Sequence, residues 1–396
     1  MGRFEVASRL KKLPPYLFAE IDRKKKAAIA AGRDVINLGI GDPDTPTPDF
    51  IVEALARAAR DPATHQYALD NGDPAFRREI AAFMERRYGV KADPDSEIYP
   101  TIGSKEAIAH FPLAFIDPGD IALIPDPCYP PYRSGVIFAG GVPVYMDLRR
   151  ESGFFPDFDA VDPRDAARAR ILYLNYPNSP TGRLATREFF EKAVAFAEKY
   201  NMIIVQDAAY AEMSFSRPAI SILEVPGAKE RAVEFHSLSK TFNMTGWRVG
   251  FAVGGAELIA GLGRVKTNVD SGIFTAIQRA ATEALRRYDD VVPKMTKMYR
   301  ERRDAFASGL KKAGWKFDPP EATFYCWIPC PEGWTSEATC SRLLEEADIV
   351  TTPGNGFGLA GEGYIRATLT VPAERLAEAA RRIGRLSWKK GGGRKG

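Results

Sequence analysis

Short apolar runs alternate with longer amphipathic stretches through the middle of the chain, and this alternation constrains the fold more than any other feature. The runs are IALIPDP, VPVYMDL, ILYLNYP, MIIVQDAAY, AVEFHSLSK and RVGFAVG, which start at residues 121, 142, 171, 202, 232 and 248. Between the third and fourth runs, TREFFEKAVAFAEKYN places Phe189, Phe190 and Val194 at helical spacing. Apolar strands separated by helices are typical of a mostly parallel sheet with both faces buried. The sequence therefore predicts an α/β fold.

The length of the chain predicts more than one structural unit. A chain of 396 residues exceeds the usual size of a single hydrophobic core. After about residue 285 the pattern changes to a long charged helix, the strand-like ATFYCWIPC and EGYIRATLTV, and a last helix. Upstream, DVINLGIGDPDTPTP ends in a proline-rich stretch suited to a linker. We expect a large domain over residues 46–285 and a smaller α/β domain built from residues 1–45 and 286–396.

Composition and charge argue against several classes of function. The net charge is +4, and the terminal KKGGGRKG alone supplies four positive charges, so we expect no nucleic-acid partner. The N-terminus has no apolar core of a secretory signal, and no apolar run is long enough to span a membrane. Four cysteines and three histidines make a structural metal site improbable. A reducing cytoplasm is the expected location.

Polar side chains follow several of the predicted strands directly. Tyr129 comes after the first run, Ser179 shortly after the third, and Asp207 after IIVQ. A further group, from Ser237 to Lys240, follows VEFH. In open α/β sheets, ligands bind beyond the carboxyl ends of the strands. The sequence therefore predicts a ligand site at this edge of the sheet.

Lys240 is the candidate nucleophile. Most lysines are solvated surface residues, and for an isolated lysine that interpretation is preferred. Here the lysine follows an apolar run and the segment HSLS, so its amine is expected to be drawn out of water. Desolvation lowers the pKa of an amine and makes it a nucleophile toward carbonyl groups. Schiff-base chemistry is the natural use of such a group.

Two clusters suit a phosphate group. Ser237, Ser239 and Arg248 offer two hydroxyl donors and a planar cation. Ser104 and Lys105 open the predicted amphipathic helix TIGSKEAIAHFPLAFI, where free backbone N–H groups favour an anion. Serine at a helix start is more often an ordinary cap. Together the clusters predict one phosphate pocket.

Asp207 and two tyrosines are the remaining candidate residues of the ligand site. A carboxylate at the end of MIIVQ needs a cationic partner, and a protonated pyridine nitrogen would serve. Tyr210 could donate its phenol to a ring oxygen, and Tyr129 offers a flat face for stacking, although either tyrosine alone is more often core. With the lysine and the phosphate pocket, these groups match pyridoxal 5′-phosphate, whose ring is an electron sink.

The motifs SLSKTFNMTGWRVG, NYPNSPTG, DAAY and YIRATLT resemble those of the fold type I pyridoxal-phosphate aminotransferases, over nearly the whole chain. The resemblance implies an enzyme with ping-pong transamination, in which Lys240 holds the cofactor as an internal aldimine and moves the substrate proton. It also implies a homodimer whose active sites are completed across the interface. The implied cofactor contacts are Asp207 to the pyridine nitrogen, Tyr210 to the ring hydroxyl, Tyr129 stacked on the ring, Ser104, Lys105, Ser237, Ser239 and Arg248 around the phosphate, and Tyr67 to the phosphate of the neighbouring subunit.

The resemblance also implies two residues on the substrate side. Arg366 in YIRATLT matches an arginine that binds the substrate α-carboxylate, which a bidentate guanidinium can orient while the amine stays free. Without the resemblance, a structural ion pair is an equally good interpretation of this arginine. Gly41 in GIGDP matches a backbone position facing the substrate, where a side chain would obstruct.

Two details depart from simple patterns. The family usually reads Asn-Pro-Thr-Gly, with the asparagine donating to the ring hydroxyl, whereas here Ser179 precedes PTG and Asn178 precedes the serine. Either side chain could make that contact. GFGLAG, starting at residue 356, satisfies a dinucleotide-binding pattern, but a strand-like segment follows it, so we predict a turn-rich loop.

Cys326 and Cys330 are expected to be small hydrophobic residues of a strand.

The segment of residues 9–48, together with GWRVGFAVG and TPGNGFG, is most similar to enzymes that transfer an amino group from LL-2,6-diaminopimelate to 2-oxoglutarate in lysine biosynthesis. Tyr16 in PPYLF matches a tyrosine on the substrate side there. Two alternatives stay open, because the cofactor motifs are shared by enzymes with many substrates. One is an aminotransferase for aspartate, alanine or another common amino acid, and the other is a pyridoxal-phosphate-dependent β-lyase or decarboxylase.

Overall fold

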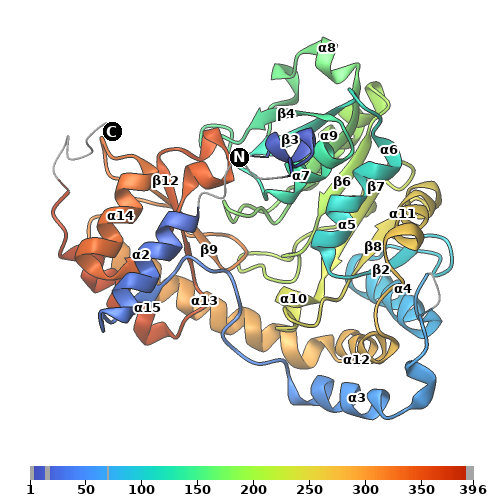
Figure 1. Ribbon diagram of the computed structural model, residues 1–396, viewed down its shortest axis with the longest axis horizontal. Helices are drawn as coiled ribbons and strands as arrows, with labels where there is room; N and C mark the ends of the chain where they lie inside the picture. Colours follow the sequence, from blue (N-terminus) through green and yellow to red (C-terminus); the bar gives the residue numbers. More distant parts are fainter. Residues whose placement is uncertain (1–3, 14–17, 69–70, 389–396) are drawn as a thin grey trace.

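The computed structural model describes residues 4–13, 18–68 and 71–388, and a seven-stranded sheet forms its largest part (Figure 1). In spatial order the strands are β2 (Ile98–Thr101), β8 (Gly250–Gly254), β7 (Ala232–Ser237), β6 (Ile203–Asp207), β5 (Ala169–Asn175), β3 (Ile121–Asp126) and β4 (Val142–Asp147). Strand β8 is antiparallel to both neighbours, and all other neighbouring pairs are parallel. The predicted α/β fold with a mostly parallel sheet is confirmed. Each of the six apolar runs contains a strand. The sequence analysis missed β2, whose four residues include a proline and are too short to show a period.

Both faces of this sheet are buried. Alternate residues of one strand belong to two different hydrophobic clusters, as for Leu172 and Tyr173 on β5. The first cluster is completed by α3 (Asp49–Ala59), α4 (Pro74–Tyr88), α9 (Arg187–Lys199) and α12 (Thr275–Arg286). The second is completed by α5 (Ser104–His110), α6 (Pro112–Phe115), α7 (Pro131–Phe138) and α11 (Ala256–Val269). Side chains of a strand alternate between faces, so continuous apolar runs are required here.

Two of the helix predictions can be compared with the structure. Helix α9 confirms the predicted helix, and it buries Phe189, Phe190 and Val194 as the spacing indicated. The single helix predicted from Ser104 is instead two short helices, α5 and α6, and α6 has Pro112 at its first position. Proline has no N–H for a helical hydrogen bond, so it starts a helix more readily than it continues one.

A second core surrounds a three-stranded antiparallel sheet in the order β11 (Thr352–Pro353), β12 (Tyr364–Thr368) and β9 (Tyr325–Pro329). The helices of this part are α13 (Tyr288–Lys312), α14 (Ser336–Ala347) and α15 (Ala373–Gly384). Segments from both ends of the chain meet here, because β1 (Ile36–Asn37) pairs in parallel with β10 (Ile349–Val350), and α2 (Phe18–Ala30) lies beside α14 (Figure 1). Cys326 is buried in β9, whereas Cys330 follows the strand and is partly exposed.

The remaining elements are short. They are α1 (Ser8–Lys11), α8 (Pro163–Ala166), α10 (Leu238–Thr241) and the 3-10 turns η1 (Pro62–Thr64), η2 (Phe158–Ala160), η3 (Ile222–Glu224), η4 (Gly354–Phe357) and η5 (Leu359–Gly361). Turns η4 and η5 cover GFGLAG and lead into strand β12, which confirms the predicted turn-rich loop. Among the described residues, no helix combines the length and the apolar character that crossing a membrane requires.

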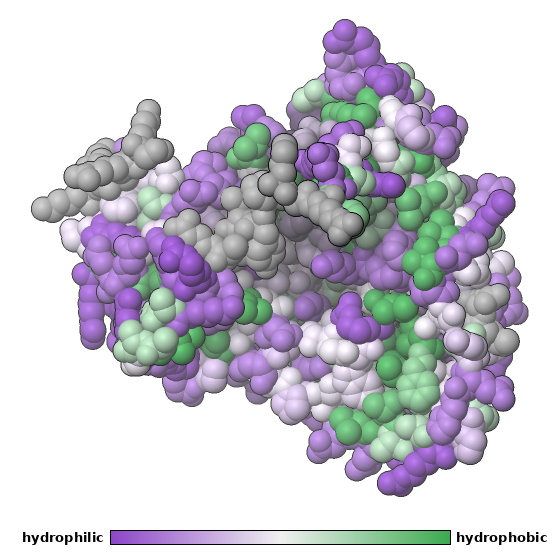
Figure 2. Space-filling view, in the orientation of Figure 1, coloured by the Kyte–Doolittle hydropathy of each residue, from purple (hydrophilic) through white to green (hydrophobic). Residues whose placement is uncertain are grey.

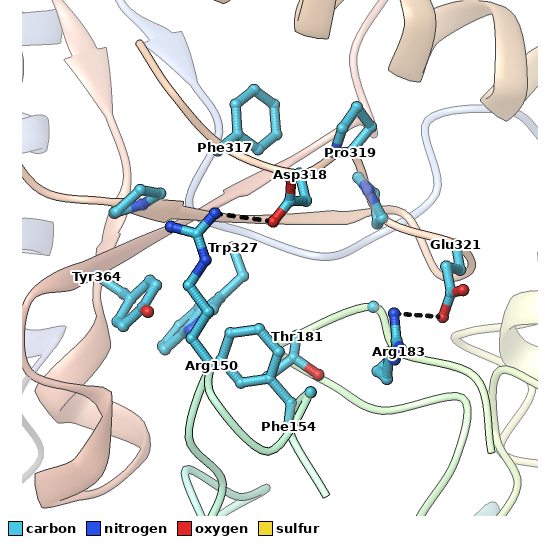
Figure 3. Close-up of a pocket in the computed structure, with 14 residues that line it drawn as sticks. Arg150, Phe154, Thr181, Arg183, Phe317, Asp318, Pro319, Glu321, Trp327 and Tyr364 are labelled. Atoms are coloured by element: carbon cyan, nitrogen blue, oxygen red, sulfur yellow. Dashed lines mark hydrogen bonds and ion pairs between the residues drawn. The ribbon is translucent and has the colours of Figure 1, made fainter. Parts of the chain in front are cut away.

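The two sheets are joined through the segment before β9. Figure 3 shows a pocket of about 290 Å³ at this junction, with one ion pair between Arg150 and Asp318 (3.0 Å) and another between Arg183 and Glu321 (3.5 Å). Such partly exposed pairs contribute little free energy. The stronger link is in the backbone, where Phe215 N–H donates to Glu321 O at 2.7 Å. This link holds the start of β9 beside the loop after β6.

Candidate active site

A cavity of about 580 Å³ lies between the carboxyl ends of the seven-stranded sheet and strands β9 and β12. Most of the residues predicted from the sequence line it: Gly41, Ser104, Lys105, Tyr129, Ser179, Asp207, Tyr210, Ser237, Ser239, Lys240, Arg248 and Arg366. These residues come from both ends and the middle of the chain, and the parallel strands bring their side chains to one edge.

Two predicted residues are not in this cavity. Tyr67 is 87% exposed and lines a different pocket, together with residues 271–274. This position gives it no contact with the cavity of its own chain. Tyr16 lies outside the described residues.

Lys240 extends from the short helix α10, directly after β7. Its Nζ donates to the carbonyl oxygen of Gly41 at 3.1 Å and lies 5.4 Å from the centre of the Phe324 ring. Burial lowers the pKa of the Lys240 amine, and the positive charges of Arg248 and Arg366 act in the same direction. Tyr325 and Asp42 oppose the shift. The amine is therefore more often neutral than a solvated lysine at the same pH.

The serines and Arg248 form a polar end of the cavity. Ser237 Oγ accepts from the backbone N–H of Ser239 at 3.2 Å, and Arg248 Nη1 donates to Thr245 O at 2.7 Å. A Cβ atom on Gly103, whose φ is +72°, would lie 2.5 Å from Arg248 Nη2. Within the described chain, Arg248 forms no ion pair with a carboxylate. Arg248 therefore packs closely against the backbone of Gly103 and has no carboxylate partner, and a guanidinium in this position suits an anionic ligand.

Asp207 is a buried carboxylate, and none of the described cationic side chains is hydrogen-bonded to it. Its Oδ2 accepts from the hydroxyl of Tyr132 at 2.8 Å, and its Oδ1 accepts from Ala209 N–H at 3.1 Å. Burial raises the pKa of the Asp207 carboxyl to about 6, although these hydrogen bonds and His236 oppose the shift. A cationic ligand group facing this carboxylate would stabilise its charged form.

Arg366 lies on β12 with two aromatic rings against its guanidinium. The Cζ atom is 4.1 Å from the centre of the Tyr325 ring and 4.5 Å from the centre of the Phe357 ring. Its Nη2 donates to Gly39 O at 3.1 Å, and its buried Nε has no hydrogen-bond partner among the described residues. The structural ion pair considered as an alternative is absent from the described part of the chain. The guanidinium is therefore held in place with N–H groups left for a ligand.

Tyrosines occupy the space between Lys240 and Arg366. The hydroxyl groups of Tyr210 and Tyr325 are 3.3 Å apart, and burial raises the pKa of Tyr210. A Cβ atom on Gly41 would lie 1.7 Å from the Tyr325 hydroxyl oxygen. A larger side chain at residue 41 would therefore displace the Tyr325 ring. Tyr129 also lines the cavity and meets Tyr132 edge to face.

The sequence analysis missed Asn175, which also lines the cavity. Its Nδ2 donates to Asp207 O at 2.8 Å, and its Oδ1 accepts from Ser179 N–H at 2.8 Å. Asn178 is turned away, because its Oδ1 accepts from both Thr181 N–H and the Thr181 hydroxyl. Asn175 is the last residue of β5 and pairs with Asp207 in register, so the rule about polar residues at strand ends could have found it. Thr245, Tyr325 and Phe357, also missed, carry no such signal in the sequence.

With this geometry in view, the chain can be compared with known proteins. The model of the family "Aminotransferase class I and II" matches residues 33–383, and the chain belongs to that family. It is therefore an aminotransferase, an enzyme class that depends on pyridoxal phosphate.

Relatives named LL-diaminopimelate aminotransferase match over nearly their full length. Those of Syntrophobacter fumaroxidans and Aquifex aeolicus are each 54% identical to this chain over 97% of its residues, which cover 100% and 99% of the relatives. Among solved structures, substrate-bound BacF from Bacillus subtilis superimposes with a TM-score of 0.94 at 38% identity, covering 98% of this chain and 99% of that one. An aspartate aminotransferase mutant of Thermus thermophilus gives 0.90 at 29% identity, covering 96% and 99%. The fold is that of the type I pyridoxal-phosphate enzymes.

The residues of the cavity fit this cofactor. The cavity is lined by Asp207, a buried carboxylate in need of a cation, and by Arg248, which lies against Gly103 and forms no ion pair within the described residues. The buried amine of Lys240 also lines it. These groups suit a pyridinium nitrogen, a phosphate and an aldehyde respectively.

Proposed function

We propose that this aminotransferase moves an amino group from LL-2,6-diaminopimelate to 2-oxoglutarate, with tetrahydrodipicolinate and glutamate as products. The observation that carries the proposal is the 54% identity, over essentially the full length, to relatives that bear this name. The fold alone does not choose the substrate, because structures named for other aminotransferases superimpose almost as well.

We assign the cofactor contacts by the chemistry of each residue. Asp207 would face the pyridine nitrogen, Arg248 and the serines of the polar end would hold the phosphate, and Asn175 and Tyr210 would donate to the ring hydroxyl. When bound, pyridoxal phosphate supplies an electron sink that acidifies the α-carbon of an amino acid. Asp207 supports this sink because its negative charge, shielded from water, keeps a facing nitrogen protonated.

Lys240 is proposed as the group that moves the proton. Burial lowers the pKa of the Lys240 amine, so the neutral Nζ can accept a proton from the substrate α-carbon. The resulting ammonium can then donate that proton to a different atom. Its hydrogen bond to Gly41 O orients the amine without supplying a charge. Donor and acceptor acids would use the same cavity in turn, which predicts ping-pong kinetics.

Arg366 is proposed to bind the α-carboxylate of both substrates. The aromatic rings of Tyr325 and Phe357 hold the guanidinium plane, and a bidentate ion pair would fix the orientation of the α-carbon.

A homodimer is the proposed assembly. The exposed position of Tyr67 supports it, because the family resemblance implies a contact with the neighbouring subunit's phosphate and the side chain does not line the cavity of its own chain. Figure 2 shows hydrophobic residues gathered near α3, α4 and α12, and Val52, Val269 and Phe274 are exposed in the chain.

We also propose that the chain forms two domains, a large one of residues 46–285 and a small one of residues 1–45 and 286–396. A cytoplasmic location is proposed as well, and the four free thiols support it.

An amino-donor screen tests the proposed substrate. The holoenzyme is offered LL-diaminopimelate, aspartate, alanine and other amino acids with 2-oxoglutarate, and glutamate is measured. We expect the highest kcat/KM with LL-diaminopimelate. Equal or faster turnover of aspartate or alanine would refute the proposed donor, and release of pyruvate and ammonia from a β-substituted alanine would indicate a lyase instead.

A further inference from the structure

The loop of residues 354–361 reaches from the three-stranded sheet to the end of β3 in the seven-stranded sheet. It leaves β11, forms the turns η4 and η5, and returns to β12. Just after β3, Cys128 N–H donates to Phe357 O at 2.9 Å, and the backbone N–H groups of Leu359 and Ala360 lie close enough to the Asp126 carboxylate to lower its pKa. The loop is therefore anchored to the strand that precedes Tyr129.

The anchor is closely fitted. Asp126 is 5% exposed, and its Oδ1 has no hydrogen-bond partner among the described residues. Gly358 has a φ of +143°, and a Cβ atom there would lie 1.8 Å from that Oδ1. The loop can approach the carboxylate this closely only with glycine at residue 358.

Burial raises the pKa of the Asp126 carboxyl to about 6. Asp147 on β4 acts in the same direction, while Arg133 on α7 and the loop N–H groups oppose it. A buried carboxylate without a cationic side chain hydrogen-bonded to it is costly. None of the steps proposed for transamination uses Asp126, so another role is needed to account for it.

The anchored loop carries Phe357 into the active-site cavity. Phe357 is 7% exposed, and its ring contacts the guanidinium of Arg366. Tyr325 supplies the other ring, but it belongs to β9 and needs no support from the loop. Of the two aromatic contacts that hold Arg366, one therefore comes from the loop that packs against Asp126.

We propose that Asp126 is a positioning residue for substrate carboxylates: with Gly358 it anchors the 354–361 loop, and the anchored loop keeps Phe357 against Arg366. The inference rests on the proposed role of Arg366 and is independent of which amino donor the enzyme prefers. It predicts a loss of carboxylate affinity with little change in cofactor binding.

The test compares Asp126→Ala with Asp147→Asn in the holoenzyme. Asp147 is the register partner of Asp126 on β4, is partly exposed and lies outside the anchor, so it controls for the loss of a nearby negative charge. We measure the KM for 2-oxoglutarate, the Kd for the unreactive dicarboxylate glutarate by calorimetry, and the absorbance of the bound cofactor. For Asp126→Ala we expect KM and Kd to rise about tenfold, the size of effect of one charged hydrogen-bonded contact, with the absorbance unchanged. Asp147→Asn should change neither value by more than about twofold.

Two further variants keep the test decisive. Asp126→Asn retains shape and an acceptor oxygen, so it should recover most of the glutarate affinity. Phe357→Leu leaves the anchor intact and removes the ring, so it should weaken glutarate binding as Asp126→Ala does, even if the alanine variant does not fold. Unchanged glutarate affinity in a folded Asp126→Ala or in Phe357→Leu overturns the inference. A wild-type enzyme that binds glutarate but prefers another amino donor corrects only the proposed substrate.

Discussion

Replacing Asp207 by asparagine should stabilise the cofactor-free protein while it impairs the enzyme. The carboxyl has a folded-state pKa of about 6, against an ordinary value of 3.8, because burial penalises its charge. A carboxyl whose folded pKa is raised contributes stability that is fully present below its unfolded pKa and is lost as the pH rises through its folded pKa. The shift of roughly two units corresponds to about 3 kcal/mol over the whole range.

Asparagine has the same shape and no charge. Its amide can donate to the Tyr132 hydroxyl, which can accept as well as donate, and its oxygen can still accept from Ala209 N–H. The variant should therefore keep the hydrogen bonds at residue 207 and lose the part of the pH dependence of the unfolding free energy that comes from this residue. Between pH 5 and pH 7.5, the unfolding free energy of the variant relative to wild type should rise by about 1 kcal/mol.

The assay is urea unfolding of both proteins, freed of cofactor, at pH 5 and pH 7.5. Other titrating groups, Asp126 among them, are shared by the two proteins and cancel in the comparison. With cofactor restored, the variant should lose roughly 100- to 1,000-fold in kcat/KM, because the facing cation is left unpaired. A stability difference that is equal at the two pH values would refute the argument from burial.

Three other predictions concern single cations. Lys240→Ala should abolish borohydride-stable attachment of pyridoxal phosphate at this residue, and mass spectrometry that still found a labelled peptide there would exclude Lys240 as the nucleophile. Arg366→Lys should raise the KM for both substrates about 10- to 100-fold, since an ammonium cannot replace the bidentate fork, and an unchanged KM in steady-state kinetics would point to another carboxylate site. Lys266→Met should lower the unfolding free energy by about 3 kcal/mol, because the buried ammonium lies 3.0 Å from the Glu106 carboxylate and 2.9 Å from the Asp270 carboxylate. The control Lys297→Met, on the surface, should change the unfolding free energy by less than about 0.5 kcal/mol. Equal effects of the two variants in urea unfolding would contradict this prediction.

The sequence predicted the parts of the fold that depend on local periodicity. The apolar runs of the central strands β3, β5, β6, β7 and β8 became strands because a sheet buried on both faces needs apolar side chains on both sides of those strands, whereas the edge strand β4 is largely exposed. Helix α9 could be predicted because its apolar residues repeat at the helical period. Strand β2 could not, since four residues with a proline show no period, and only pairing with β8 makes them a strand.

Within the site, the sequence alone determined which chemical groups are present: the amine of Lys240, the carboxylate of Asp207 and the guanidinium of Arg366. It also indicated that Lys240 and Asp207 lie at the ends of strands. Strand direction then made it predictable that those in the seven-stranded sheet share one edge. Only the tertiary structure decided what surrounds them. The rings on Arg366, the hydroxyl of Tyr132 on Asp207 and the anchor between Asp126 and Gly358 join residues far apart in the chain. Such contacts depend on how separate elements pack, and no local pattern in the sequence records that packing.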